Sequence, residues 1–146
     1  MFKSLMQCEC GVKCHDSALL VLRVVLGAIF VYHGYDKVFV TGIPGIAGFL
    51  GSLGFPAAVF FAYVLAYGEL IAGVLLIVGL FTHWAAKYAV IIGIVAFAMV
   101  HASKGFSVAQ GGYEFIVLIF AAALVVLSMG AGKYSLDAMM RKGGSM

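Results

Sequence analysis

The chain has little charge and little proline, and what it lacks already narrows its class. Only 10% of its 146 residues are charged and only two are proline, while 64% are hydrophobic. A typical soluble domain is about 45–50% apolar, and the mean hydropathy here is +1.14. This balance excludes an ordinary soluble domain. A net charge of +3 is also too small to indicate nucleic-acid binding. We therefore predict an integral membrane protein of one domain.

Several chemical motifs are also missing. The sequence has no nucleotide-binding fingerprint, and its apolar segments contain no cofactor motif. All three cysteines fall within the first 14 residues, which excludes a disulfide mechanism inside the membrane part. The first 16 residues are polar, without the apolar core of a secretory signal. We therefore expect the first apolar segment to remain as a membrane anchor.

Four apolar stretches can each reach the ~20 residues needed to cross a bilayer. The expected spans are residues 17–40, 57–81, 84–102 and 113–129. Between the first two, residues 41–56 carry apolar residues at helical spacing, with Pro44 and Pro56 as start and stop signals. This pattern predicts a short helix lying in the membrane interface. The predicted fold is all-α, a four-helix transmembrane bundle without a soluble domain or an internal repeat.

The predicted organisation has three parts: a cysteine-rich tail at 1–16, the membrane domain at 17–138, and a polar tail at 139–146. Ser17 is the expected cap of the first span, with Asp16 as the alternative. Lysine and arginine are more frequent on the side that holds both termini, which predicts that both termini are cytoplasmic.

Glycines are expected to pack the bundle. Gly27 and Gly34 lie seven residues apart on one face of the first span, and Gly68 and Gly73 lie in the second. Small residues let membrane helices approach closely, because apolar side chains gain nothing by leaving lipid for one another.

Ionisable side chains nevertheless occur within the spans. Charge there costs at least ~2.5–3.5 kcal/mol per residue, so such side chains are candidates for function. His33, Asp36 and Lys37 are spaced to share one face of the first span. The other spans contribute Glu69 near the midplane, His101 at a span end and Glu114 at a span start. With cytoplasmic termini, all of them fall in the outer half of the bundle.

This layer supplies the candidate catalytic residues: His33, Lys37, Glu69, His101 and Glu114. Glu69 needs a partner, for which His33, Lys37 or a tyrosine hydroxyl is available. Glu114 is expected to pair with His101 or Lys37. Histidine titrates near neutrality, so the layer is suited to passing protons. The alternative is that the pairs only lock the bundle together.

Two further sets of polar residues belong to the spans. Tyrosines in the same outer half are candidate cofactor contacts, or else an aromatic belt at the membrane boundary. They are Tyr32, Tyr63, Tyr67 and Tyr113. Arg23, near the inner end of the first span, is expected to extend its side chain to the interface.

The N-terminal tail has the pattern C-x-C-x3-C-H, formed by Cys8, Cys10, Cys14 and His15. Four such ligands can hold zinc, Cu(I) or an iron–sulfur cluster. A cytoplasmic location argues against stable disulfides and for metal or redox chemistry. The spacing is not that of common zinc or haem sites, and the alternative is a tail whose thiols have no specific role.

Five segments, taken in order, resemble the DoxX family over roughly residues 17–138. They are RVVLGAIFVYHGYDKVF (23–39), GFLGSLGFP (48–56), GELIAGVLLIVGLFT (68–82), VHASKGF (100–106) with GGYEF (111–115), and GKYSLD (132–137). The resemblance implies a four-helix bacterial inner-membrane protein. The family's characteristic polar positions are matched by Arg23, His33, Lys37, Glu69, His101 and Glu114. The cysteine tail is not part of the family pattern.

A branch of that family is similar to the membrane subunit of thiosulfate:quinone oxidoreductase. The resemblance therefore implies a quinone-linked oxidoreductase, or a membrane subunit of one, acting on a small sulfur compound or a thiol partner. The alternative is a non-catalytic membrane scaffold for a soluble redox or metal-handling protein. A transporter is a weaker hypothesis, because four spans make a cramped permease unless the chain forms a homo-oligomer.

Overall fold

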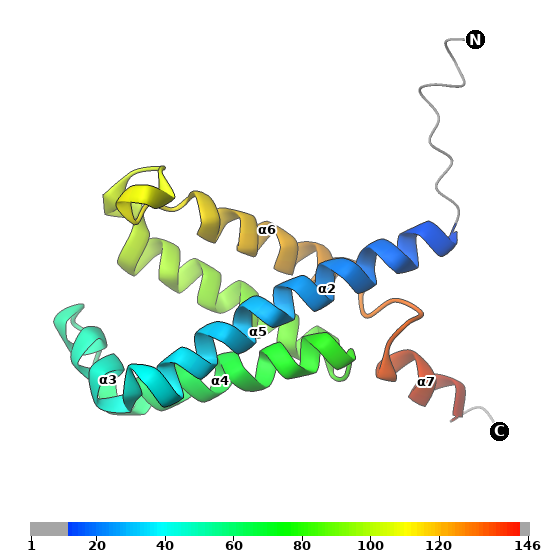
Figure 1. The fold of residues 1–146 in the computed structure, drawn as a ribbon, viewed down its shortest axis with the longest axis horizontal. Coiled ribbons are helices and arrows are strands. Elements are labelled where there is room, and N and C mark those ends of the chain that lie inside the picture. The colour runs from blue at the N-terminus through cyan, green and yellow to red at the C-terminus, as the bar shows by residue number, and fades with distance from the viewer. Residues whose placement is uncertain (1–11, 144–146) are drawn as a thin grey trace, which may run out of the picture.

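The computed structural model describes residues 12–143, and this part of the chain consists of helices and connecting loops, with no strand (Figure 1). The main helices are α2 Val12–Tyr35, α3 Gly42–Ser52, α4 Ala58–Val78, α5 Thr82–Ala96, α6 Glu114–Met129 and α7 Leu136–Gly143. The shorter elements are the π-helical η1 Asp36–Val40 and η2 Phe97–His101, and the 3₁₀ turns η3 Ala102–Lys104 and η4 Val108–Gln110.

Three helices are long and apolar enough to cross a membrane. They are Cys14–Val40, which continues α2 through η1, then α4, and Thr82–Lys104, which continues α5 through η2 and η3. The fourth expected span is shorter: α6 has 16 residues and is apolar. It begins after Gly111 and Gly112 and ends at Gly130, which leaves it short of the ~20 residues of a full crossing.

The short helix predicted within residues 41–56 is present as α3. Its position in the membrane interface stays a prediction. The two ends of the described chain differ more from expectation. The first helix begins at Val12 and runs through Ser17, so Ser17 does not cap it. Residues 139–143, expected to belong to a polar tail, form the second half of α7, since Leu136, Met139 and Met140 follow helical spacing.

Glycines set the close approach of α2 and α4. A Cβ added to Gly27 would lie 2.7 Å from the carbonyl oxygen of Gly73, and one added to Gly34 would lie 2.7 Å from Cα of Leu70. Only glycine fits at such contacts. The packing role predicted for these glycines is confirmed.

Helices α2, α4, α5 and α6 enclose one apolar core. Its larger members are Leu26, Phe30, Leu76, Ile119 and Val126. Alanines of α5 and α6 lie between them and are almost fully buried. In Figure 1, α6 runs back along α5 toward the end of the molecule where α2 begins.

At that end, residues 131–137 fold back onto the bundle and form what we call the C-terminal clasp. Arg23 lies beneath it with only 1% of its surface exposed. Its Nη1 donates to the carbonyl of Ala131 at 3.0 Å and its Nη2 to that of Tyr134 at 2.7 Å. The expectation that Arg23 reaches out to the interface is therefore wrong, because the clasp offers carbonyl acceptors inside the protein.

Asp137 completes the clasp. Its carboxylate accepts hydrogen bonds from the N–H groups of Phe81 and Thr82, both at 2.9 Å, and its own N–H donates to the Gly79 carbonyl at 2.9 Å. Phe81 has φ 47°, which is costly for a residue with a side chain, and this hydrogen bond supports it. Burial acts to raise the pKa of Asp137, but the hydrogen bonds from Thr82 and Phe81 and the charge of Arg141 bring it below its ordinary value.

Candidate functional site

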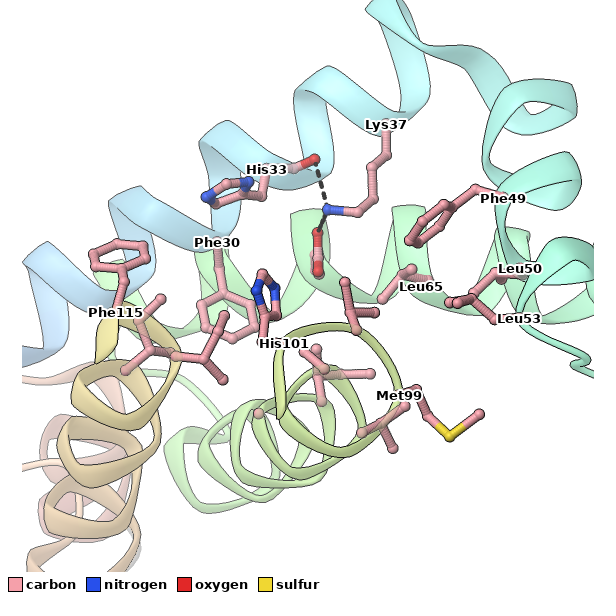
Figure 2. A pocket seen from close by; sticks show the side chains of 18 of the residues that line it. Phe30, His33, Lys37, Phe49, Leu50, Leu53, Leu65, Met99, His101 and Phe115 are labelled. Atoms are coloured by element: carbon pink, nitrogen blue, oxygen red, sulfur yellow. Dashed lines mark hydrogen bonds and ion pairs between the residues drawn. The ribbon is translucent and has the colours of Figure 1, made fainter. Parts of the chain in front are cut away.

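The half of the bundle away from the clasp contains a cavity of about 400 Å³. Residues of α2, α3, α4, α5 with η2, and α6 line it, and most of the lining is apolar. Figure 2 shows these side chains, among them Phe30, Phe49, Leu50, Leu53, Leu65, Met99 and Phe115. This volume falls within the ~300–1,000 Å³ of typical small-molecule sites.

An ion pair lies on the wall of this cavity. Lys37 Nζ donates to Glu69 Oε2 at 2.7 Å and lies 3.5 Å from the carbonyl oxygen of His33. Glu69 comes from the middle of α4 and is only 6% exposed. Among the partners that the sequence allowed for Glu69, the structure selects Lys37. In the described part of the chain, Glu69 Oε1 has no hydrogen-bond partner, so one carboxylate oxygen remains available to a bound molecule.

Two histidines line the same cavity, His33 from α2 and His101 from η2 (Figure 2). His101 Nδ1 lies 2.6 Å from the carbonyl oxygen of Gly111. A carbonyl only accepts, so we assign the His101 proton to Nδ1. In the neutral ring Nε2 is then an acceptor, and it becomes a donor when the ring is protonated.

Glu114 does not join this group. Its Oε1 accepts the N–H of Val108 at 2.6 Å, and it is not among the residues that line the cavity. The expected pairing with His101 or Lys37 is therefore wrong. The reason is local, because the loop before α6 places a backbone donor closer to the carboxylate than either side chain.

The four tyrosines also lie away from the cavity lining. Tyr63 and Tyr67 stack on each other with centroids 6.0 Å apart on the exposed face of α4. Tyr113 packs edge-on against Phe97 and Phe106. Tyr32 is exposed on α2. The exposure of Tyr32, Tyr63 and Tyr67 agrees better with the alternative, an aromatic belt, than with contacts to a molecule in this cavity.

Sequence reasoning missed the apolar walls. Phe49 and Leu50 of α3, with Leu53 and Phe55 just after it, close one side of the cavity. Their spacing of three and four residues along 41–56 was the available signal, and it was assigned only to a membrane-surface position. The wall from α5 and η2, which includes Met99, carries no distinct pattern.

Only part of the cysteine tail lies within the described residues. Cys8 and Cys10 lie outside them, and His15 is exposed at the start of α2. Cys14 is disulfide-bonded, contrary to the expectation of reduced thiols. The metal site predicted for Cys8, Cys10, Cys14 and His15 stays a prediction. Within residues 12–143 no group of three or more His, Cys, Asp or Glu side chains could hold a metal ion.

Comparison with known proteins decides the family. The DoxX family model matches residues 18–102, which hold His33, Lys37, Glu69 and His101. The chain belongs to the DoxX family.

Two relatives match this DoxX member over most of both lengths. It is 34% identical over 131 residues to the Bacillus subtilis (strain 168) protein named "Putative oxidoreductase CatD", covering 90% of the chain and 92% of that protein. It is 32% identical over 129 residues to an uncharacterised Haemophilus influenzae protein, covering 86% and 84%. None of the solved structures matches the chain significantly.

Proposed function

We propose that this DoxX protein is a quinone-linked oxidoreductase, or the membrane subunit of one, whose electrons come from a small sulfur compound or a thiol partner. One observation carries the proposal: an apolar cavity with the Lys37–Glu69 ion pair and two histidines on its wall. The name of the Bacillus subtilis relative supports the reaction class.

The lining suits a quinone in two respects. A quinone has a flat apolar ring with an apolar tail, and Phe30, Phe49 and Phe115 provide aromatic walls. Its carbonyl oxygens need donors, and Lys37 Nζ lies on the lining with three N–H groups. When bound, a quinone supplies an acceptor for two electrons and two protons. Oxidation of two thiols to a disulfide releases the same numbers, so the overall reaction balances.

The residues of the chain would handle the protons. Lys37 holds the Glu69 carboxylate through a 2.7 Å hydrogen bond, while Glu69 Oε1 can take or give a proton at the cavity wall. His101 is oriented through its Nδ1–H on Gly111, which leaves Nε2 to exchange a proton with a bound molecule. His33 is the second donor from the wall.

The proposal includes a topology. We take α6 as a fourth crossing, since it packs along α5 and returns the chain to the end where α2 begins (Figure 1). An even number of crossings places both ends of the membrane part on one side. The lysine and arginine bias favours the cytoplasmic side of a bacterial inner membrane.

The test begins with the protein purified in native-lipid particles. We expect mass spectrometry to find bound quinone in a fixed ratio to protein, and the particles to reduce a soluble quinone with thiosulfate or a dithiol. Glu69→Gln keeps an oxygen acceptor for Lys37 but cannot exchange a proton, and should lower turnover by at least ~100-fold. The unfolding temperature is measured alongside, because this variant leaves the Lys37 charge without its carboxylate. Asp36→Asn is the matched control, because Asp36 bonds Thr41 and does not line the cavity.

Two results would contradict the proposal. Particles that hold no quinone and show no turnover with either reductant would favour the non-catalytic scaffold. Full turnover in Glu69→Gln would remove this carboxylate from the mechanism. Metal analysis of the same particles, with Cys8, Cys10 and Cys14 together replaced by serine as the comparison, tests the proposed metal site in the tail.

A further inference from the structure

Helix α7 presents an apolar face that the rest of the described chain does not cover. Leu136, Met139 and Met140 are spaced by three and four residues, and Met139 and Met140 are 67% and 64% exposed. The other side of the helix is fixed to the protein, since Ala138 is buried there and Ser135, just before the helix, is buried as well. The exposed face is therefore a stable feature of the fold.

The C-terminal clasp fixes the position of α7 along the membrane normal. Asp137, in its first turn, bonds Gly79 at the end of α4 and the N–H groups of Phe81 and Thr82 at the start of α5. Both of these helices are long enough to cross a membrane. Their ends then lie at a bilayer surface, and α7 lies beside them, as Figure 1 shows.

Aromatic residues at this end of the bundle also indicate a position at the membrane surface. Trp84 in the first turn of α5 and Tyr134 in the clasp are both exposed. These two residue types are enriched at the boundary between membrane and water. Lys87 lies over the Trp84 ring at 4.6 Å, which adds a cation beside the boundary.

The charges around α7 are mostly positive. Lys133, Arg141 and Lys142 lie within ten residues of one another, and the acids beside them are Asp137 and Asp16, whose Oδ1 accepts the N–H of Lys133 at 3.0 Å. The Asp137 carboxylate is already bonded to two backbone N–H groups. A short helix with an apolar face and flanking basic residues is the kind that lies on anionic lipid.

We propose that α7 binds the bilayer surface, with Leu136, Met139 and Met140 among the upper acyl chains and Lys133, Arg141 and Lys142 on anionic phospholipid headgroups. This proposal is independent of the reaction in the cavity. A second copy of the chain is a poorer occupant, because an eight-residue helix cannot supply the ~800 Å² per partner of a standard protein interface.

Hydrogen exchange of the full chain in nanodiscs tests the proposal. One set contains phosphatidylcholine alone, and the other contains phosphatidylcholine with phosphatidylglycerol. We expect amides of residues 138–142 to exchange at least about fivefold more slowly in the anionic discs, the effect of roughly one basic residue at an anionic surface. Exchange at the amides of Phe81 and Thr82 reports that the clasp is intact.

Two double variants separate the contributions. Arg141→Gln with Lys142→Gln should abolish the difference between the two lipids. Met139→Ser with Met140→Ser should speed amide exchange of residues 138–142 in both kinds of nanodisc. Lys104→Gln, an exposed basic residue outside the clasp and α7, is the control and should change neither.

Three results would overturn the proposal. Equal exchange of wild-type α7 in the two lipids would remove the anionic preference, and this comparison needs no variant. Unchanged exchange in both double variants would show that neither face contacts lipid. Protection only in discs that hold two copies of the chain would make a second copy the occupant.

Discussion

The C-terminal clasp and the cavity each contain buried or half-buried charge, but the charges have different partners. In the clasp, Arg23 bonds two backbone carbonyls and Asp137 bonds two backbone N–H groups. In the cavity, Lys37 and Glu69 bond each other, and one oxygen of Glu69 has no partner within residues 12–143. Backbone partners cannot leave, whereas a side-chain pair beside a cavity can exchange one partner for a bound molecule.

This difference separates a structural from a functional use of charge. Buried ion pairs contribute little to stability compared with apolar residues of similar volume. A charge that ties backbone segments together, by contrast, satisfies groups that would otherwise be buried without partners. The clasp therefore stabilises the bundle, and the cavity pair is the candidate for chemistry. The predictions that follow test each side of this contrast, beginning with the largest effect.

Replacing Arg23 should have the largest effect on stability. Arg23→Met removes the donors to the Ala131 and Tyr134 carbonyls, which then have no hydrogen bond from this side chain. We therefore expect a loss of about 3 kcal/mol in the free energy of unfolding. Thermal unfolding in lipid particles measures it. Bound quinone, counted below the unfolding temperature, should be unchanged. Arg23→Lys keeps one donor and should be intermediate, and an unchanged unfolding temperature in Arg23→Met would contradict the role of the clasp.

Gly34→Ala should affect both stability and the cavity. The added methyl would meet the backbone of Leu70 and push α2 from α4, at a cost of about 1–3 kcal/mol. Gly34 lies one turn before Lys37, so the Lys37–Glu69 pair should loosen and quinone retention should fall. Gly48→Ala is the matched control, since a Cβ there has nothing within 4 Å. Equal behaviour of the two variants would argue against the close contact of α2 and α4.

The smallest expected effect is the pH dependence of the clasp. The pKa of Asp137 is below its ordinary value of about 3.9, so its stabilising contribution is complete above that value and is lost as the pH falls through the lower folded pKa. The difference in unfolding temperature between wild type and Asp137→Asn should be constant from neutral to mildly acidic pH and shrink below about pH 4. A difference that grows toward acid would reverse the sign and contradict the account.

The sequence predicted the parts of this fold that depend on composition and spacing. Hydropathy located the long helices, and the interval between Gly27 and Gly34 identified the face that meets α4. The spacing of His33 and Lys37, with a carboxylate near the midplane of the next span, indicated an ion pair that the structure confirms as Lys37–Glu69. Each of these signals lies in side chains of one helix or of two neighbouring helices.

Contacts made to the backbone could not be predicted in this way. The acceptors of Arg23 are carbonyls 108 and 111 residues further along the chain. Every residue has a backbone carbonyl, so the amino-acid sequence does not show which ones accept. Glu114 was expected to pair with His101 or Lys37, since acidic and basic side chains attract each other, yet its partner is the N–H of Val108.

The most direct test of the central contrast replaces the cavity pair by apolar residues. In Lys37→Met with Glu69→Leu, no charge is left without its partner, so we expect an unfolding temperature at or above that of wild type. Quinone content and turnover are then measured on the same native-lipid particles. A stable protein that has lost both is the predicted result. A stable protein that keeps its quinone and its turnover would show that the pair only packs the bundle.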